Sequence, residues 1–487
     1  MNMSYSMATT SSVAALPRHF PATTLVLSMA LMLGGCASQR TSFEPVPTKT
    51  PAAWSQRSDA PEVSADQWWK QFGDPELDAL IARALRTNNN LAVAAIKVRR
   101  AQLDAGLAAD ARTPVLSANA STSGNRRLDG SGSSYRSSNG SVALAYEADL
   151  WGRLGANYDV KRWEALATEQ DRQSAALTLI GTTANLYWQG AYLNGLIARA
   201  NESIAYAQKT LDLVRTQYNA GAVSTLEILE AEQNLSNQQS NLTQLLQQQV
   251  ENANALAILF DSPPGERTAL PAGLPQQALP DLAAGLPADL LGRRPDLRAA
   301  ELRLRESLAT VDATRTSYYP KLVLTGSLGS SSDALARLVQ NPIATLGAQL
   351  SLPFLQWNQM QLNVKISRAD YESAVTTFRQ TLYAAFSDVE NALSARRQYA
   401  AQETLLQRNL AAAQGAERLY ALRYRSGSAT LRVWLDAQES RRKAENALSE
   451  ARLNRLKNQM TLYQALGGDA QAGPGNGVAT VAPAANS

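Results

Sequence analysis

The sequence is poor in the residues on which most enzyme chemistry depends. Its 487 residues include one histidine, His19, and one cysteine, Cys36, both near the N-terminus. Histidine acid–base catalysis, Ser-His-Asp triads, Cys-His nucleophiles and ordinary zinc sites therefore have no candidates in the rest of the chain. The glycine-rich stretch at 130–140 lacks the lysine and the strand-loop-helix context of a phosphate loop. Only scattered Asp and Glu remain, so we expect neither a catalysed reaction nor a resident cofactor.

Charge of one sign is also scarce. The sequence has 46 Lys and Arg against 42 Asp and Glu, a formal net charge of +4, and no basic block. So weak and scattered an excess does not favour nucleic acid as a partner.

The N-terminus has the layout of an export signal. Arg18 and His19 precede the apolar run at 23–35, which is too short to span a membrane as a mature helix, and Cys36 follows directly. The sequence LGGC at 33–36 resembles a bacterial lipobox. We therefore predict a signal peptide at 1–35 and a covalent lipid on the thiol of Cys36. The alternative is a signal peptide followed by an incidental thiol.

One long unit occurs twice. The stretch YNAGAVSTLEILEAE begins at Tyr218 and YRSGSATLRVWLDAQ at Tyr424, an offset of 424 − 218 = 206, and the same register holds without a gap over about 88–262 and 294–468. A fixed long period indicates a duplicated module. The predicted organisation is a signal peptide (1–35), an anchored N-terminal segment (36–73), a first repeat (74–262), an equatorial linker (263–293), a second repeat (294–468) and a disordered tail (469–487).

Each repeat is predicted to contain a helix, a strand hairpin and long helices. Apolar and polar residues alternate at 141–150, 321–328 and 344–352, and more weakly from Pro114 to Ser121. Strand by strand, this pattern fits a membrane barrel and a soluble half-buried sheet equally well. The proline-free windows at 115–262 and 354–473 predict very long helices. The 65 residues from Arg153 to Gln217 would span about 98 Å, and leucines at coiled-coil spacing predict a bundle.

Several stretches, in order along the chain, resemble the TolC-like outer membrane factor family, in particular its efflux lipoprotein branch. They are QWWKQFGDPELDALIARALRTNNNLAVA at 67–94, YEADLWGR at 146–153, LGRRPDLRAAE at 291–301 and the two turns with tyrosine and glycine. The resemblance implies a membrane β-barrel joined to a long α-helical coiled-coil tube. Four strands per protomer would close one twelve-stranded barrel in a homotrimer, with a helical tunnel in the periplasm. Open strand edges cannot lie in lipid, which also requires oligomerisation.

The resemblance places the repeated stretch at the periplasmic tips of the tube, where helix pairs reverse. Gly221 and Gly427 suit a tight reversal, because glycine adopts positive φ without strain. Family tips contact a periplasmic adaptor, so the resemblance makes Tyr218, Gly221, Tyr424 and Gly427 candidate docking residues. The alternative for the two glycines is that they are present only because the turn requires glycine.

Acidic residues that face the lumen follow the tip turns in the family. By motif match these are Glu227, Glu230 and Asp436, which the resemblance makes candidates for a periplasmic gate. The alternative is that they are ordinary partners of a helix dipole. Ala429 stands where some family members carry a locking arginine, which leaves Arg432 as the nearest substitute.

Taken together, the expected protein is a lipid-anchored exit duct in the outer membrane of a Gram-negative bacterium, with a long periplasmic extension. It would serve an adaptor and an inner membrane pump by passive export of small molecules such as drugs. The alternatives are a non-conducting structural coiled-coil lipoprotein and a duct for metal or protein export. The sequence does not name the exported compound.

Overall fold

The computed structural model describes residues 40–55, 67–126, 134–276, 279–280, 282, 284–285, 287–332 and 342–468. The predicted signal peptide, Cys36 and the tail at 469–487 lie outside these ranges. The chain forms two compact units. A strand unit includes Ala109–Asn157 and Ala309–Lys365, and a helical unit includes Phe43–Ala108, Tyr158–Leu308 and the chain from Ile366 onward. Each unit thus contains parts of both sequence repeats.

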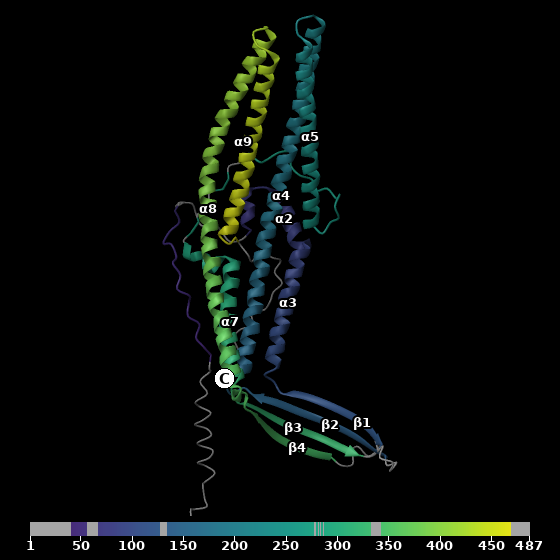
Figure 1. The fold of residues 1–487 in the computed structure, drawn as a ribbon, viewed down its shortest axis with the longest axis vertical. Helices are drawn as coiled ribbons and strands as arrows, with labels where there is room; N and C mark the ends of the chain where they lie inside the picture. The colour runs from purple at the N-terminus through teal and green to yellow at the C-terminus, as the bar shows by residue number, and fades with distance from the viewer. Residues whose placement is uncertain are drawn as a thin grey trace, which may run out of the picture. The chain divides into compact units, whose positions relative to one another are not determined.

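The strand unit holds one antiparallel sheet. Its strands are β1 (Val115–Arg126), β2 (Ser134–Ala148), β3 (Lys321–Ser332) and β4 (Pro342–Ser351), paired in the order β1-β2-β3-β4 (Figure 1). All four alternating segments are confirmed as strands. The hairpin of each repeat joins the other through β2 and β3, so the two repeats share a single sheet.

The strand register places the large apolar side chains on one face. Leu116 lies opposite Leu144, which lies opposite Gly326, and Gly326 lies opposite Leu346. Directly opposite residues of an antiparallel pair share a face. The exposed apolar residues of this face are Leu116, Val142, Leu144, Tyr146, Leu324, Leu328, Leu346 and Leu350. Their exposure runs from 36% for Tyr146 to 91% for Leu346, so a single chain leaves this face uncovered.

The DLWGR segment at 149–153 connects the sheet to the first long helix. The carboxylate of Asp149 accepts hydrogen bonds from the backbone N–H groups of Leu154 (3.0 Å) and Gly155 (2.8 Å). Gly152 has φ +74°, and Arg153 pairs with Glu147 at 2.7 Å. These contacts support a structural role for the segment.

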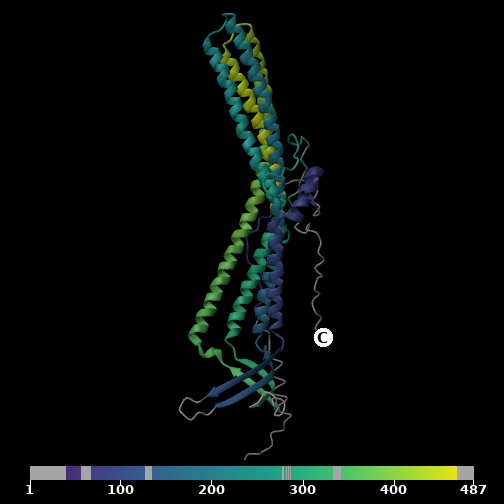
Figure 2. The same ribbon diagram turned by 90° about the vertical axis from the view of Figure 1, so that its right-hand side faces the viewer.

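The remaining elements are helical. They are η1 (Trp68–Phe72), α2 (Pro75–Thr87), α3 (Asn89–Asp110), α4 (Arg153–Asn219), α5 (Thr225–Leu259), η2 (Pro287–Asp289), α6 (Leu290–Arg293), α7 (Pro295–Ser317), η4 (Pro353–Leu355), α8 (Trp357–Arg425) and α9 (Leu431–Ala465). With 67 residues in α4 and 69 in α8, the prediction of very long helices is confirmed. In the helical unit, α4 with α5 and α8 with α9 form two hairpins whose turns lie at the same end (Figures 1 and 2). No helix among the residues described above contains a stretch apolar and long enough to cross a bilayer.

A repeated hydrogen bond ties each hairpin together. The side-chain amide of Asn252 on α5 donates to the carbonyl of Leu186 on α4 at 3.1 Å. Asn458 on α9 donates in the same way to the carbonyl of Ala392 on α8 at 3.0 Å. Asn458 and Ala392 lie 206 residues after Asn252 and Leu186, respectively. The offset of 206 residues seen in the sequence therefore recurs in this pair of side-chain contacts.

Aromatic residues from distant segments form the centre of the helical unit. Trp68 is fully buried and stacks on Tyr463 with ring centroids 4.7 Å apart. Phe72 packs against Trp188 at 5.0 Å. The aromatic run after Gln67 thus packs η1 against α4 and α9, and the hairpins extend from this core.

Candidate functional site

The first tip joins α4 to α5 by a tight glycine turn. Gly221 has φ +74°, and its N–H donates to the carbonyl of Tyr218 at 2.8 Å. The N–H of Ala222 donates to the carbonyl of Gln217 at 2.9 Å. This pair of bonds is a Schellman motif, which satisfies carbonyls at the end of a helix and favours glycine at the left-handed position.

The second tip repeats this backbone between α8 and α9. Gly427 has φ +73°, its N–H donates to the carbonyl of Tyr424 at 3.0 Å, and the N–H of Ser428 donates to the carbonyl of Arg423 at 2.8 Å. Both predicted turn glycines therefore adopt the conformation that glycine favours.

A small apolar core lies just behind the two turns. It combines residues of all four long helices: Leu211, Val214, Ala231, Ala421, Tyr424, Leu431 and Trp434. Tyr424 stacks on Trp434 with centroids 5.1 Å apart, and Tyr206 meets Trp434 edge-on at 6.2 Å. The hydroxyl of Tyr424 donates to Oε1 of Gln217 at 2.6 Å. The two hairpins are thereby joined within one chain.

The two candidate docking tyrosines have different environments. Tyr218 is 42% exposed at the first tip, whereas Tyr424 is only 6% exposed. Tyr424 therefore supports the tip from inside, and the first tip presents its tyrosine to the outside.

Glu227 lies in a capping box at the start of α5. Its carboxylate accepts a hydrogen bond from the backbone N–H of Ser224 at 3.0 Å and another from the Ser224 hydroxyl. The Ser224 hydroxyl in turn accepts from the N–H of Leu226 at 3.2 Å. The hydrogen bond from the Ser224 side chain lowers the pKa of Glu227 below its ordinary value. In α9 the equivalent position is Val433, and the N-cap Thr430 makes no side-chain cap.

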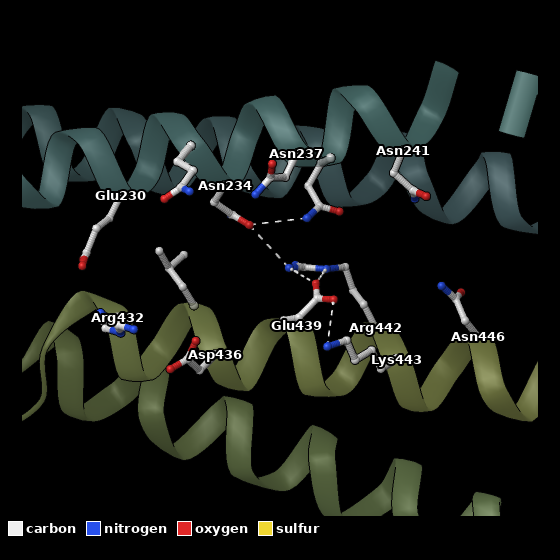
Figure 3. A pocket seen from close by; sticks show the side chains of 13 residues that line it. Glu230, Asn234, Asn237, Asn241, Arg432, Asp436, Glu439, Arg442, Lys443 and Asn446 are labelled. Atoms are coloured by element: carbon white, nitrogen blue, oxygen red, sulfur yellow. Dashed lines mark hydrogen bonds and ion pairs between the residues drawn. The ribbon is translucent and has the colours of Figure 1, made fainter. Parts of the chain in front are cut away.

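Glu230 and Asp436 face a common groove between α5 and α9 (Figure 3). They are equivalent residues of the two repeats, since 436 − 230 = 206. The groove has a volume of about 540 Å³, and Arg432 also lines it. Of the three predicted gate residues, the structure brings together Glu230 and Asp436 and leaves Glu227 out of the groove lining.

The two walls of the groove differ in chemistry. The α5 wall is mainly uncharged amides, namely Gln233, Asn234, Asn237, Gln238 and Asn241. The α9 wall is charged, and there Arg442 pairs with Glu439 at 2.8 Å and Lys443 with Glu439 at 3.7 Å. Nη2 of Arg442 also reaches Oδ1 of Asn234 at 3.5 Å (Figure 3). Sequence reasoning missed these lining residues, although the amide-rich run after Asn234 was a visible signal.

A second polar contact joins the two hairpins next to the small apolar core behind the turns. The hydroxyl of Tyr206 on α4 donates to Glu417 on α8 at 2.9 Å. Arg441 on α9 lies 3.4 Å from the same carboxylate and 2.7 Å from Glu445. Burial, together with the hydrogen bond to Glu417, raises the pKa of Tyr206 to about 12. The phenol therefore stays protonated and donating at neutral pH.

Metal binding has no support in the parts of the chain that the structure describes, where no group of three or more His, Cys, Asp or Glu could hold an ion. The tips and groove are instead a surface of turns, amides and ion pairs suited to contacts with other chains or with solutes.

Comparisons with known proteins agree with this architecture. A model of the outer membrane efflux protein family matches residues 80–260 and 286–468. The pyoverdine export outer membrane protein OpmQ of Pseudomonas aeruginosa is 33% identical over 461 residues, covering 91% of this chain and 96% of the relative. The toluene efflux pump outer membrane protein TtgC of Pseudomonas putida is 30% identical over 457 residues, covering 90% and 94%.

Solved structures show the same fold. The outer-membrane channel OprN superposes with a TM-score of 0.81 at 26% identity, over 89% of this chain and 100% of that one. The open state of the Neisseria gonorrhoeae MtrE outer membrane channel gives a TM-score of 0.77 at 29% identity, over 89% and 99%. The fold is thus that of the TolC-like outer-membrane channels. The chain belongs to the outer membrane efflux protein family.

Proposed function

We propose that this protein is the exit duct of a tripartite efflux system, through which small molecules leave the cell passively. The observation that carries the proposal is the four-stranded sheet with one apolar face that a single chain leaves uncovered, in a chain of the efflux family. Such a face suits lipid, and the opposite face, rich in Ser, Thr, Asn and Gln, suits water. We assign no catalysed reaction.

The functional unit would be a homotrimer. In one chain β1 and β4 are the edges of the sheet, and an unpaired backbone group in hydrocarbon costs several kcal/mol. Three chains would supply 3 × 4 = 12 strands, and pairing of β1 with β4 of a neighbouring copy would remove every edge. The long helices would then form the periplasmic tube.

A lipid on Cys36 would anchor the same protein to the outer membrane. The proposal rests on the apolar run before Cys36, the small residues Gly34 and Gly35, and the absence of any other cysteine. Ala37 follows the cysteine, and the family resemblance implies sorting to the outer membrane where no aspartate stands there. The anchor would add to the membrane attachment of the barrel.

A periplasmic adaptor would dock on the tips and connect the duct to an inner membrane pump. The exposed side chain of Tyr218 and the turns at Gly221 and Gly427 are the proposed contacts, with Tyr424 supporting them from the tip core. Glu230 and Asp436 would form acidic rings at a narrow entrance, with Glu227 holding the start of α5 beside them.

Small molecules are the favoured cargo. The relatives named above export pyoverdine and toluene, and antibiotic efflux is the function named for ArpC of Pseudomonas putida, which is 30% identical. A toxin and drug export protein of Aggregatibacter actinomycetemcomitans is 29% identical, which keeps toxin export as a second candidate.

Conductance measurements test the proposal directly. The purified full-length protein should run as a heat-modifiable trimer from outer membrane fractions and should give discrete current steps in a planar bilayer. Deletion of its gene should raise intracellular accumulation of a fluorescent efflux substrate such as ethidium. A trimer that gives no current steps under any voltage would support the non-conducting structural lipoprotein instead.

A further inference from the structure

The two tips share a backbone but differ sharply in charge. In the fifteen-residue window at 418–432, four arginines and no acidic residue occur: Arg418, Arg423, Arg425 and Arg432. In the equivalent window at 212–226, Asp212 and Arg215 balance each other. The residues equivalent to the four arginines are Asp212, Gln217, Asn219 and Leu226. The duplication therefore conserved the turn and changed its electrostatics.

All four arginine side chains are exposed, and no ion pair among the described residues includes them. Farther along the same hairpin the pattern is different. Arg441 contacts Glu417 and Glu445, and Arg442 contacts Glu439. Arg441 and Arg442 of α9 thus have acidic partners, whereas the four arginines of the second tip, like Arg379, Arg397 and Arg408 of α8, take part in no ion pair among the described residues. What sets the second tip apart is that four such arginines gather around one turn.

Local helix energetics explain only part of this patch. Arg423 and Arg425 lie in the last turn of α8, where a cation interacts favourably with the helix dipole. Arg418 lies about two turns before that end, and Arg432 lies in the first turn of α9, where a cation is unfavourable. The first tip ends α4 without any basic residue in its last turn. The fold therefore does not need four arginines to make this turn.

We propose that the second tip is a receptor for an acidic protein surface, formed by carboxylate side chains of a periplasmic partner. This rests on the proposed docking function and assigns the chemistry of one of its two contacts. The patch contains arginine and no lysine. The planar guanidinium binds carboxylates in a bidentate manner, and arginine is enriched at protein interfaces. A diffuse anionic surface would attract lysine as well as arginine, so a patch of arginine alone favours a protein partner.

The first tip would take a different surface of the partner. Tyr218 is 42% exposed and Leu226 63% exposed there, and Leu226 stands where the second tip has Arg432. One chain would therefore offer an apolar contact and a basic contact at equivalent turns. A partner must present two unlike surfaces to occupy both, which gives the assembly a defined rotational register.

The test uses the full-length trimer and a pair of designed helical-hairpin peptides of identical length. One peptide carries three Glu beside its loop and the other carries three Gln. The tip variant is R418Q/R423Q/R425Q, which leaves Arg432 in the groove. The matched control is R379Q/R397Q/R408Q, three exposed arginines of α8 away from the tip, so that both variants lose the same charge.

The Glu peptide should bind the parent protein at least tenfold more tightly than the Gln peptide, as measured by fluorescence anisotropy. The tip variant should lose this preference, and the control should keep it within about twofold. Equal binding of the two peptides to the parent, or loss in both variants alike, overturns the proposal. So does a tip variant that dissociates into monomers, because the arginines would then pair with acids of a second copy. Loss of binding to phosphatidylglycerol vesicles with unchanged peptide preference would assign the patch to lipid.

Current steps separate this inference from the proposed function. The tip variant should conduct like the parent in a planar bilayer while failing to restore ethidium efflux to a deletion strain. Unaltered efflux by the tip variant refutes acidic docking and leaves the duct standing. A parent protein that neither conducts nor restores efflux refutes the duct itself.

Discussion

The hydroxyl of Tyr424 donates a 2.6 Å hydrogen bond to Oε1 of Gln217, so a residue of the second tip is held by the first. Its repeat equivalent, Tyr218, is 42% exposed. Tyr424→Ala should lower the local stability of the tips by about 3 to 5 kcal/mol, since it removes a buried aromatic ring. Tyr424→Phe should cost about 1 kcal/mol, because only the hydrogen bond is lost. Hydrogen exchange of the tip amides measures both. Tyr218→Ala is the control and should change exchange by less than the equivalent of about 0.5 kcal/mol.

The repeated asparagine bond predicts equal effects in the two hairpins. Asn252→Ala and Asn458→Ala each remove a hydrogen bond to a helix carbonyl and should each cost about 0.5 to 1.5 kcal/mol of local stability. Hydrogen exchange around Leu186 and Ala392 reports the two losses separately. Asn201→Ala, at an exposed position of α4, controls for the gain in helix propensity. Strongly unequal losses of stability would mean that the two equivalent hydrogen bonds no longer contribute equally to their hairpins.

Much of the fold could be predicted because its signals are local or periodic. Alternation located all four strands, the scarcity of proline located the long helices, and the 206-residue offset joined Gly221 to Gly427. Pairing of β2 with β3 could not be predicted in this way, because it depends on contacts between residues far apart in the chain. The same reason hid the aromatic core, where Trp68 meets Tyr463.

The candidate site was less predictable than the fold. Sequence identity between repeats suggested one role for Tyr218 and Tyr424, but burial depends on the neighbouring helices and separates them. Glu227 and Glu230 belong to one helical turn, yet only Glu230 reaches the groove, because Glu227 turns back to cap α5. Side-chain direction around a helix, more than residue type, decided these roles.

A buried carboxylate predicts that the α8–α9 contact weakens in acid. Glu403 accepts hydrogen bonds from Arg452 (3.1 Å) and Arg455. Burial alone would raise the pKa of Glu403, but the two arginines more than offset burial and hold it below the ordinary value of 4.5. A lowered folded-state pKa means that the contribution is complete above 4.5 and is lost as the pH falls through the folded-state value.

Glu403→Gln should therefore cost about 1 to 3 kcal/mol near pH 7 and progressively less at lower pH. Both arginines remain about one third exposed, which keeps the figure below that of a fully buried pair. Hydrogen exchange near Arg452, corrected for intrinsic rates between pH 7 and pH 3, gives the measurement. Glu372→Gln, on an exposed turn of α8, should leave the profile unchanged.

An added charge should impair assembly much more on one face of β4 than on the other. Leu346 lies in the middle of the strand on the apolar face and is 91% exposed in one chain, while the adjacent Thr345 lies on the other face. Leu346→Arg should cost about 2 to 4 kcal/mol if that face meets lipid near the bilayer centre, and Thr345→Arg should cost little. Trimer yield in outer membrane fractions, compared on semi-native gels, checks the difference. Similar yields for the two variants would show that the apolar face does not meet lipid.

The groove between α5 and α9 predicts which acids control ion passage. In a trimer Glu230 and Asp436 would each give three carboxylates around one axis, and unit charges about 6 Å apart repel by roughly 0.7 kcal/mol in water and about 3 kcal/mol at an effective dielectric near 20. Such rings attract cations. The parent channel should therefore be weakly conducting, cation-selective and blocked by multivalent cations from the periplasmic side.

Replacing Glu230 by Gln and Asp436 by Asn should weaken the selectivity and relieve the block while leaving the trimer intact, because the amides keep the volume and remove the charge. Glu227→Gln provides the internal comparison. Glu227 is bound to Ser224 in the capping box and is absent from the groove lining. Glutamine can still accept the hydrogen bond from the Ser224 N–H, so this substitution removes the charge, keeps the cap and should change selectivity much less. Reversal potentials in a salt gradient, with and without a trivalent cation, distinguish the contribution of Glu227 from that of Glu230 and Asp436. If Glu227→Gln alone abolishes the block by multivalent cations, the carboxylate of Glu227 must face the axis of the trimer in addition to capping α5. Unchanged selectivity when all three residues are replaced together would mean that they are only helix-start and groove residues and that the constriction lies elsewhere.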